Sequence, residues 1–202
     1  MHRLIFATAN KHKLREMREL LPSFELESLP DGVELPPEEG DSFAEIALEK
    51  ARTAHAATGE AAIGDDSGIE AVVLGGRPGI HSARYGGEGA SDEENLAKLL
   101  REVAEAGEDR RAAYHCALAL VEADGSERVF EARCEGRLIE EARGTGGFGY
   151  DPAFVPDDTG ADDPRTMSEL SQGEKNEISH RGRAARLLAA HLGAGEATSG
   201  AR

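Results

Sequence analysis

The chain has 202 residues, of which 39% are hydrophobic and 31% are charged, and its formal net charge is −16. This length and composition predict one domain of ordinary size and exclude a membrane span, since no run of about 18 apolar residues is present. The negative charge argues against nucleic acid as the main partner, because a protein that binds phosphates must supply cations to replace their counterions.

The first forty residues predict a strand, a helix and a second strand. Residues 3–8 form a short apolar run typical of a buried strand, and residues 10–21 place apolar side chains on one helical face. Pro22 ends that helix, since proline cannot continue it. Residues 24–29 predict the second strand, and a loop rich in proline and glutamate follows over 30–41.

Three serine–glutamate pairs predict the starts of later helices by forming capping boxes, in which each side chain bonds the other residue's backbone N–H. The pairs are Ser42–Glu45, Ser91–Glu94 and Ser171–Glu174. The first predicts a helix over about 43–57, and the third caps a last helix over 176–192. We expect the small, polar residues 193–202 to be a disordered tail, which leaves 1–192 as a single domain.

Strands and a loop separate these helices. Residues 61–64 predict a short strand that ends at Asp65 and Asp66, and residues 112–136 predict a β-hairpin. Residues 144–156 begin with so many glycines that we expect a loop without regular structure.

The cysteines indicate the compartment. Cys116 and Cys134 both fall in the predicted hairpin, and the chain has no Cys-x-x-Cys motif and no clustered histidines. This pattern argues against a zinc site or a disulfide scaffold and fits a reducing cytosol. With no signal peptide in the given sequence, we expect a cytoplasmic protein with two free thiols.

Two short segments are basic in this acidic chain. Residues 1–20 hold five Lys/Arg against two acids, and residues 175–191 hold four against one. They suggest a small anionic ligand bound from two sides, although two solvated helix faces are the simpler alternative. In the first segment, backbone N–H groups at the helix start would form an anion cradle with Thr8, Asn10 and Lys13. An ordinary helix capped by asparagine is the alternative.

Two adjacent acids, Asp65 and Asp66, indicate a cation site. Neighbouring carboxylates repel each other unless a cation or hydrogen bonds compensate, and on a strand they point to opposite faces. Glu38, Glu39 and Glu45 are further hard oxygen donors. Mg²⁺ is typically held by one or two carboxylates and substrate phosphates, which fits this small donor set. Plain turn chemistry is the alternative.

The glycine-rich loop does not fit a dinucleotide-binding motif. Residues 144–149 match G-x-G-x-x-G, but Tyr150-Asp151-Pro152 follow where that motif requires a helix. The glycines would instead let the backbone lie close to a flat ligand that stacks on Phe148. A flexible surface loop is the alternative.

The second basic segment places Lys175 five and six residues before His180 and Arg181. On one continuous helix these positions turn by about 140° and 240°, so Lys175 would share a face with neither. We therefore expect Lys175 at the helix entrance and the other two on its first turns.

Four strings in chain order resemble the inosine triphosphate pyrophosphatases, which hydrolyse deaminated purine nucleoside triphosphates. They are "ATANKHKLREM", "GDDSGIEAVVLGGRPGIHSARY", "GTGGFGYDPAFVP" and "EKNEISHRGRA", and the resemblance covers residues 3–192. It implies a mixed α/β fold with a long curved central sheet flanked by helices, and two lobes with a cleft between them. It also implies a homodimer and Mg²⁺-dependent cleavage of ITP, dITP or XTP to the nucleoside monophosphate and pyrophosphate.

The resemblance gives each matching residue a role. Asp66 would be the catalytic acid-base residue and a metal ligand, Glu38 the other ligand, and Ser67 a substrate contact. The triphosphate would lie on Thr8, Ala9, Asn10, Lys11, His12 and Lys13. Base and phosphates would be bound by Phe148, Gly149, Tyr150, Asp151, Lys175, His180 and Arg181.

Two departures from the family pattern concern these residues. Ala9 stands where many members have glycine, so the turn must tolerate a Cβ. Glu38 and Glu39 are adjacent, which leaves the second metal ligand open by one residue; counting back seven from Glu45 favours Glu38.

Two other functions compete with this one. A phosphatase that releases orthophosphate would usually carry a D-x-D-x-T string, which is absent. A non-catalytic module that binds or senses a purine nucleotide would not need the acid at Asp66 beside Glu38 and Lys13. The expected partner is a small nucleoside triphosphate, with neither nucleic acid nor membrane.

Overall fold

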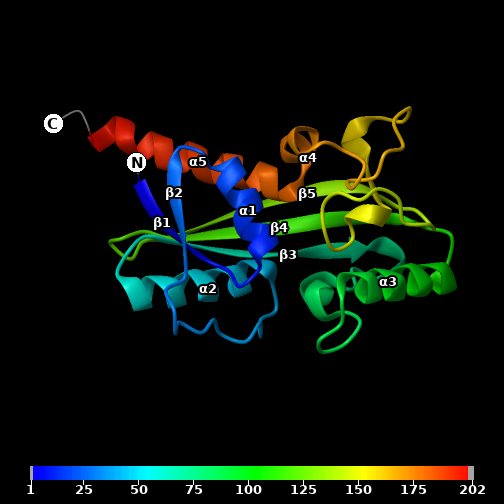
Figure 1. Cartoon of the computed structure of the whole chain (residues 1–202), viewed down its shortest axis with the longest axis horizontal. Coiled ribbons are helices and arrows are strands. Elements are labelled where there is room, and N and C mark those ends of the chain that lie inside the picture. The colour runs from blue at the N-terminus through cyan, green and yellow to red at the C-terminus, as the bar shows by residue number, and fades with distance from the viewer. Residues whose placement is uncertain (1, 200–202) are drawn as a thin grey trace. The chain divides into compact units, whose positions relative to one another are not determined.

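The computed structural model describes residues 2–199 and contains a six-stranded mixed sheet with the strand order β2-β1-β3-β4-β5-β6 (Figure 1). The strands are β1 (His2–Ala7), β2 (Phe24–Ser28), β3 (Ala62–Ala71), β4 (Arg111–Val121), β5 (Glu127–Leu138) and β6 (Phe154–Pro156). The helices are α1 (Lys11–Leu20), α2 (Phe43–Thr58), α3 (Asp92–Ala106), α4 (Gln172–Ile178) and α5 (His180–Ser199). The predicted mixed α/β class is confirmed. Among the helices of this described part, none is long and apolar enough to cross a membrane.

The chain falls into two compact units, each assembled from separate stretches of sequence. The first unit comprises the residues up to Asp66, Cys116–Ala132 and the stretch from Arg181 onward. The second unit comprises Ser67–His115 and Arg133–His180. Each unit has its own hydrophobic core.

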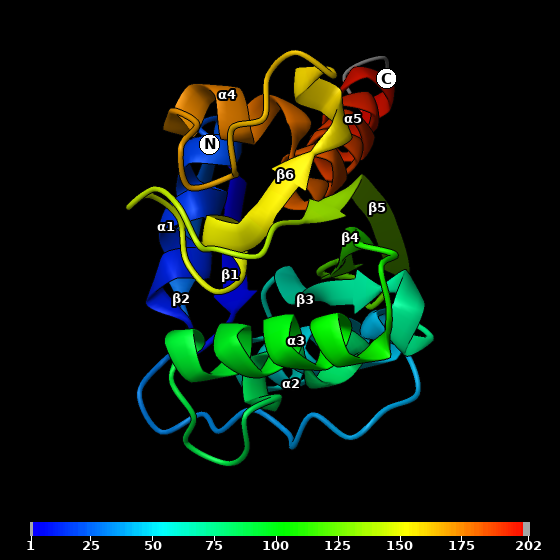
Figure 2. The same ribbon diagram turned by 90° about the vertical axis from the view of Figure 1, so that its right-hand side faces the viewer.

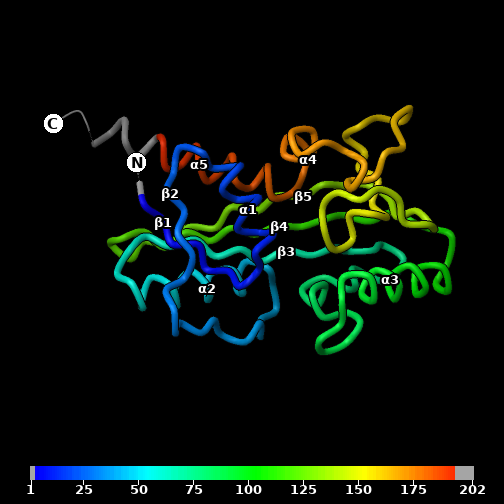
Figure 3. The backbone as a smooth tube through the Cα atoms, in the orientation of Figure 1, coloured from blue at the N-terminus to red at the C-terminus, as the bar shows by residue number. Residues whose placement is uncertain are grey.

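The core of the first unit follows the two-residue period of its strands. β1 and β2 are parallel neighbours, as the tube in Figure 3 shows. Leu4 and Phe6 pack in one cluster with side chains of α1 and α5. Ile5 and Ala7, which point the other way, pack in a second cluster with a side chain of α2. Helices therefore cover both faces of β1.

A glycine lets α2 lie close against β3. A Cβ at Gly64 would lie 1.9 Å from the carbonyl oxygen of Ala47 and 2.9 Å from the backbone nitrogen of Ala51. Such distances are far inside van der Waals contact, so a larger residue would push the helix away from the strand. This close approach determines where the side chains of α2 meet β3.

Strand β3 corrects one prediction. It runs over Ala62–Ala71, so Asp65 and Asp66 lie within the strand and not at the end of a short one over 61–64. The strand continues through two adjacent acids because Asp65 is paired with Lys13 and Arg181, and Asp66 with Lys50.

The core of the second unit combines α3 with parts of β3, β4, β5 and β6, and Figure 2 shows α3 beside β3. Leu96, Leu99 and Val103 of this helix lie in one buried cluster with Tyr114 of β4 and Phe154 of β6. The predicted loop over 144–156 is only partly irregular. Its end forms a short 3₁₀ helix and then β6, because the apolar Phe-Val-Pro run pairs antiparallel with β5.

The predicted capping boxes form fully at two of the three sites, Ser91 and Ser171. At Ser42 only the serine half forms, since the Glu45 carboxylate accepts from the backbone N–H of Asp41 instead. The box at Ser171 begins the short helix α4, and not one continuous last helix as predicted. The extended backbone of Ser179 (ψ 153°) separates α4 from α5.

Helix α5 extends further than the sequence predicts. It is assigned as helix through residues 193–199, the first part of the stretch that we expected to be a disordered tail. The last part of that predicted tail, residues 200–202, lies outside the described residues.

Candidate active site

The first unit neutralises its two adjacent acids with different cations. The Lys13 ammonium lies 2.5 Å from Oδ1 of Asp65, and Nε of Arg181 donates to Oδ2 of Asp65 at 2.8 Å. The ammonium of Lys50 donates to Oδ1 of Asp66 at 2.8 Å. Burial alone would raise the pKa of Asp65, but the charges of Arg181 and Lys13 outweigh it and hold that pKa well below its usual range. Asp65 is therefore a buried carboxylate anion.

Lys50 connects the two predicted metal ligands. Besides Asp66, its ammonium donates to Oε1 of Glu38 at 2.6 Å, whereas the neighbouring Glu39 is exposed. Burial alone would lower the pKa of Lys50, but Asp66 and Glu38 reverse the shift and raise it. Our sequence reasoning did not assign Lys50 a role. The available signal was its position as the single basic residue among nine acids over 25–50.

Arg181 is enclosed by two carboxylates. Its Nη1 donates to Oε2 of Glu16 at 2.8 Å, in addition to the bond with Asp65, and only 3% of the residue is exposed. Burial would lower the pKa of Arg181, but Asp65 and Glu16 raise it well above its usual value. Sequence reasoning missed Glu16, because an acid on a helix normally indicates a solvated face.

The start of α1 differs from the predicted anion cradle. Oδ1 of Asn10 accepts from the backbone N–H groups of His12 (2.8 Å) and Lys13 (3.2 Å), and Oγ1 of Thr8 accepts from that of Asn10 (3.1 Å). These three N–H groups therefore bond to the protein itself. Of the cradle, the ammonium of Lys13 remains as the charged group, bound to Asp65.

Part of this segment lines a pocket of about 890 Å³ in the first unit. The pocket is bordered by Thr8, Ala9, Asn10, Lys11, Leu14, Arg15, Arg18, Glu19, Ser28, Leu29 and Asp31. It thus contains the first four of the six residues predicted to hold the triphosphate.

In the second unit, the loop of residues 148–151 folds around the carboxylate of Asp151. This buried group accepts from the hydroxyl of Tyr114 (3.1 Å), the ammonium of Lys175 (2.8 Å) and the backbone N–H of Phe148 (3.0 Å). A Cβ at Gly147, whose φ is 70°, would lie 2.1 Å from Oδ2 of Asp151. Glycine is required there because the carboxylate occupies the space of a side chain.

Two more bonds fix this loop. The hydroxyl of buried Tyr150 donates to the carbonyl oxygen of Ser82 at 2.7 Å, and the backbone N–H of Gly149 donates to Oδ2 of Asp92 at 2.8 Å. Phe148 is half-buried. Three of the four loop residues thus contact other parts of the second unit through hydrogen bonds.

The remaining predicted residues of the second unit are also placed in this structure. The imidazole of buried His180 stacks on Tyr114, with ring centroids 4.5 Å apart and planes 4° from parallel. The ammonium of Lys175 lies 5.2 Å from the ring centroid of Phe148. Tyr114 and Asp151 thus connect Lys175 with His180. Ser67 is half-buried in β3.

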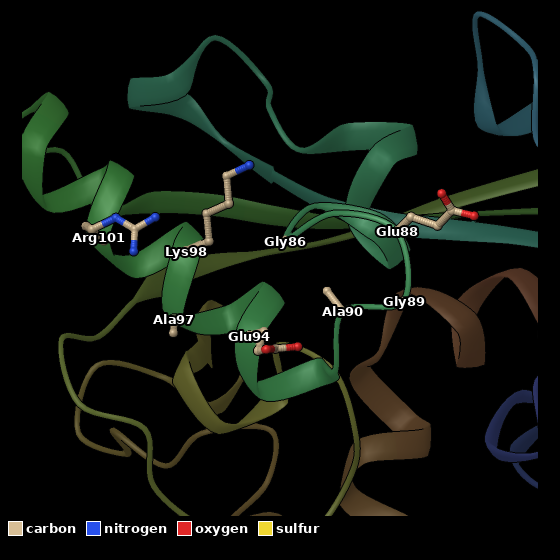
Figure 4. Close-up of a pocket in the computed structure, with 8 residues that line it drawn as sticks. All are labelled: Gly86, Glu88, Gly89, Ala90, Glu94, Ala97, Lys98 and Arg101. Carbon is tan, nitrogen blue, oxygen red and sulfur yellow. The ribbon is translucent and has the colours of Figure 1, made fainter.

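A second pocket, of about 500 Å³, contains none of the predicted residues. It lies in the second unit between α3 and the preceding loop (Figure 4). Its lining residues are Gly86, Glu88, Gly89, Ala90, Glu94, Ala97, Lys98 and Arg101.

The donor set favours a cation that needs few protein ligands. Within residues 2–199, no group of three or more His, Cys, Asp or Glu side chains is arranged to hold a metal ion. Glu38 and Asp66, however, both contact the single nitrogen of Lys50, so one cation can bridge the two carboxylates. Two carboxylates are the usual protein contribution to an Mg²⁺ site that is completed by phosphates and water.

The chain belongs to the Ham1 family, whose model matches residues 4–191. This confirms the family resemblance that the four sequence motifs indicate. The chain is 48% identical to a dITP/XTP pyrophosphatase of Geobacter sulfurreducens over 96% of this chain and 98% of that protein. It is 47% identical to a dITP/XTP pyrophosphatase of Mycolicibacterium paratuberculosis, over 93% and 94% of the two chains.

Solved structures agree with this assignment. A HAM1 protein from Coxiella burnetii matches with a TM-score of 0.84 and 39% identity, over 95% of this chain and 98% of that one. The Staphylococcus aureus Ham1 protein matches with a TM-score of 0.83 and 35% identity, over the same shares.

Proposed function

We propose that the protein is a Mg²⁺-dependent pyrophosphatase that hydrolyses deaminated purine nucleoside triphosphates, namely ITP, dITP and XTP, to the monophosphate and pyrophosphate. The observation that carries this proposal is the position of Lys50, whose ammonium contacts both Asp66 and Glu38. A non-catalytic nucleotide module has no need for a buried acid held beside a second carboxylate. Family membership and the names of the curated relatives support the same reaction.

In the first unit, Asp66 would accept a proton from the attacking water. Burial raises the pKa of Asp66 above its usual value, which makes the carboxylate a stronger base. Lys13 and Lys50 would face the negative charge that develops on the leaving pyrophosphate. Glu38 and Asp66 would hold Mg²⁺, which when bound neutralises charge on phosphate oxygens.

In the second unit, Phe148 would stack on the purine. Lys175 lies close to the ring of Phe148 and is bound to Asp151, so it can direct its charge toward a phosphate or carbonyl oxygen next to the base. His180 can donate a hydrogen bond to a 6-oxo purine, whereas adenine presents a 6-amino donor. Ser67, Gly149 and Tyr150 complete the proposed set of contacts.

The test is to incubate the purified protein with ITP, XTP, ATP or GTP and Mg²⁺, and to measure pyrophosphate and orthophosphate separately. We expect one pyrophosphate per ITP, loss of activity with a chelator, and recovery when Mg²⁺ is restored. Preference over ATP can reach about 10⁴-fold, since donors left unpaired by adenine are costly. Orthophosphate alone would indicate a phosphatase, and tight ITP binding without turnover would indicate a non-catalytic module.

The proposal also includes a homodimer in the cytoplasm. The two cysteines, Cys116 and Cys134, are buried and neither is part of a disulfide, which fits a reducing compartment. The dimer is supported by the family resemblance, and sedimentation velocity at several concentrations would measure it.

A further inference from the structure

Asp92, the first residue of α3, is bonded to the middle of the 148–151 loop. Its Oδ2 accepts from the backbone N–H of Gly149 at 2.8 Å, across 57 positions of sequence. A backbone N–H that donates to a carboxylate makes a charge-assisted bond, which is stronger than one between neutral groups.

The helix does not need Asp92 for its own start. Ser91 and Glu94 form the full capping box of α3, in which each accepts from the other's backbone N–H. This box fixes the backbone on either side of Asp92. The exposed carboxylate of Asp92 is therefore carried by a rigid helix turn and remains available for a partner outside that turn.

Gly149 can be held only through its backbone. Its φ is 62°, in the left-handed region, and it has no side chain that could pack to hold the backbone in place. Phe148 is fixed by the loop's own Asp151, and Tyr150 by the carbonyl oxygen of Ser82. The bond that Gly149 donates to Asp92 thus restrains the residue between the two aromatic side chains.

We propose that Asp92 is a positioning residue that holds Gly149, so that the loop presents Phe148 to the purine in one arrangement. This inference rests on the proposed function, in which that loop binds the base. Without the bond, the loop must be ordered when the substrate binds. The cost would appear mainly in KM and in the discrimination between purines, and less in kcat.

The experiment compares Asp92→Ala, Asp92→Asn and the control Glu93→Ala in the full chain. Glu93→Ala removes the same charge from the same exposed helix turn. We expect Asp92→Ala to raise the KM for ITP on the order of 10-fold, with kcat within about twofold and a lower ITP/ATP ratio of kcat/KM. Asp92→Asn keeps an acceptor oxygen, so its KM for ITP should stay close to that of the wild type. Hydrogen exchange of the Gly149 amide should accelerate in Asp92→Ala and not in the control.

Each outcome decides the proposal. An unchanged KM and ITP/ATP ratio in Asp92→Ala would overturn it, as would an equal loss in Glu93→Ala, which would show that the effect comes from the charge of the helix turn. If the wild-type protein releases no pyrophosphate from ITP, the proposed function fails and this inference fails with it. The inference fails alone if the wild type releases pyrophosphate from ITP but Asp92→Ala changes neither the KM nor the ITP/ATP ratio.

Discussion

The cluster around Asp65 in the first unit and the loop of residues 148–151 in the second both bury a carboxylate, but they stabilise it differently. Asp65 faces two full charges, the ammonium of Lys13 and the guanidinium of Arg181. Asp151 faces a single ammonium, and its other partners are a phenol and a backbone N–H. In the first unit two cations balance the buried carboxylate, whereas in the second a single cation does so and the carboxylate also organises a backbone turn.

This difference has a consequence for substitutions. Removing a charge from a buried ion pair leaves its partner uncompensated, which costs folding stability. Removing a hydrogen bond from a loop leaves the core intact and changes mainly the geometry that a ligand meets. We therefore expect variants of the first cluster to affect stability or the chemical step, and variants of the loop to affect KM.

The largest effect should come from Arg181→Ala, which leaves the buried carboxylates of Asp65 and Glu16 without their guanidinium. We expect the free energy of unfolding to fall by about 3–5 kcal/mol, measured by urea denaturation. The exposed Arg15 is the matched control, and Arg15→Ala should change stability by no more than about 0.5 kcal/mol.

The same variant tests the predicted role of Arg181 in reading the base. If Arg181→Ala is as stable as the wild type but loses its preference for ITP over ATP, the guanidinium reads the base. The first cluster would then affect substrate binding as the loop does, which would contradict the contrast between the two regions. Arg181→Lys would not restore either property fully, because lysine lacks the planar fork that bonds Asp65 and Glu16 together.

The next largest effect concerns Asp66→Asn. Asparagine keeps the shape of the side chain but cannot accept a proton from water, so turnover of ITP should fall by at least about 100-fold. Circular dichroism should show a folded protein, since Lys50 retains Glu38 as a counter-ion. Near-normal turnover in a folded Asp66→Asn variant would contradict the assignment of Asp66 as the catalytic acid-base residue.

A smaller effect on turnover is expected for Asp151→Asn, which tests the loop of residues 148–151 against the cluster around Asp65. The amide oxygen can still accept from Tyr114 or Phe148, but the charge facing Lys175 is lost. We expect a KM for ITP raised roughly 10-fold and a stability loss of about 3 kcal/mol, because the buried ammonium of Lys175 loses the charge of Asp151. Asp162→Asn, on an exposed loop of the same unit, should change neither. A drop in kcat with an unchanged KM would contradict the assignment of this loop to binding.

The smallest effect is a titration in the second unit. Burial of Tyr85, together with the adjacent Glu102 carboxylate that accepts from its hydroxyl, raises the pKa of this phenol to about 12. A tyrosine in the unfolded chain ionises near 10, so between these values the folded state binds more protons and stability falls as pH rises. Ultraviolet titration of phenolate should show a step near pH 12 that Tyr85→Phe removes. A step near pH 10 in its place would contradict the pairing with Glu102.

Local features of the fold followed from the sequence, because they depend on neighbouring residues. Two capping boxes, the helix of residues 10–21 and the hairpin over 112–136 occur where spacing and turn residues predict them. The break at Ser179 did not follow, since the apolar pattern continues across it. The available signal was the residue type, because serine commonly precedes the first turn of a helix.

The composition of the candidate site was only partly predictable. Motifs indicated Asp66, Glu38 and Lys13, but pairings between distant positions leave no local pattern. Arg181 meets carboxylates that lie 116 and 165 positions away. Two adjacent acids normally indicate the end of a strand, and the cations that allow β3 to continue through them are distant in the sequence. The length of β3 therefore could not be predicted either.

The discontinuous composition of the first unit affects how the protein is made. Its core combines Leu4 and Phe6 with Leu188 of α5, so it cannot close until nearly the whole chain has left the ribosome. The face of β1 that carries Leu4 and Phe6 therefore stays exposed to solvent while the second unit is being synthesised. Nascent chains stalled before residue 181 should therefore be degraded readily in their N-terminal part, and a premature stop codon late in the message would be as damaging as one near its start.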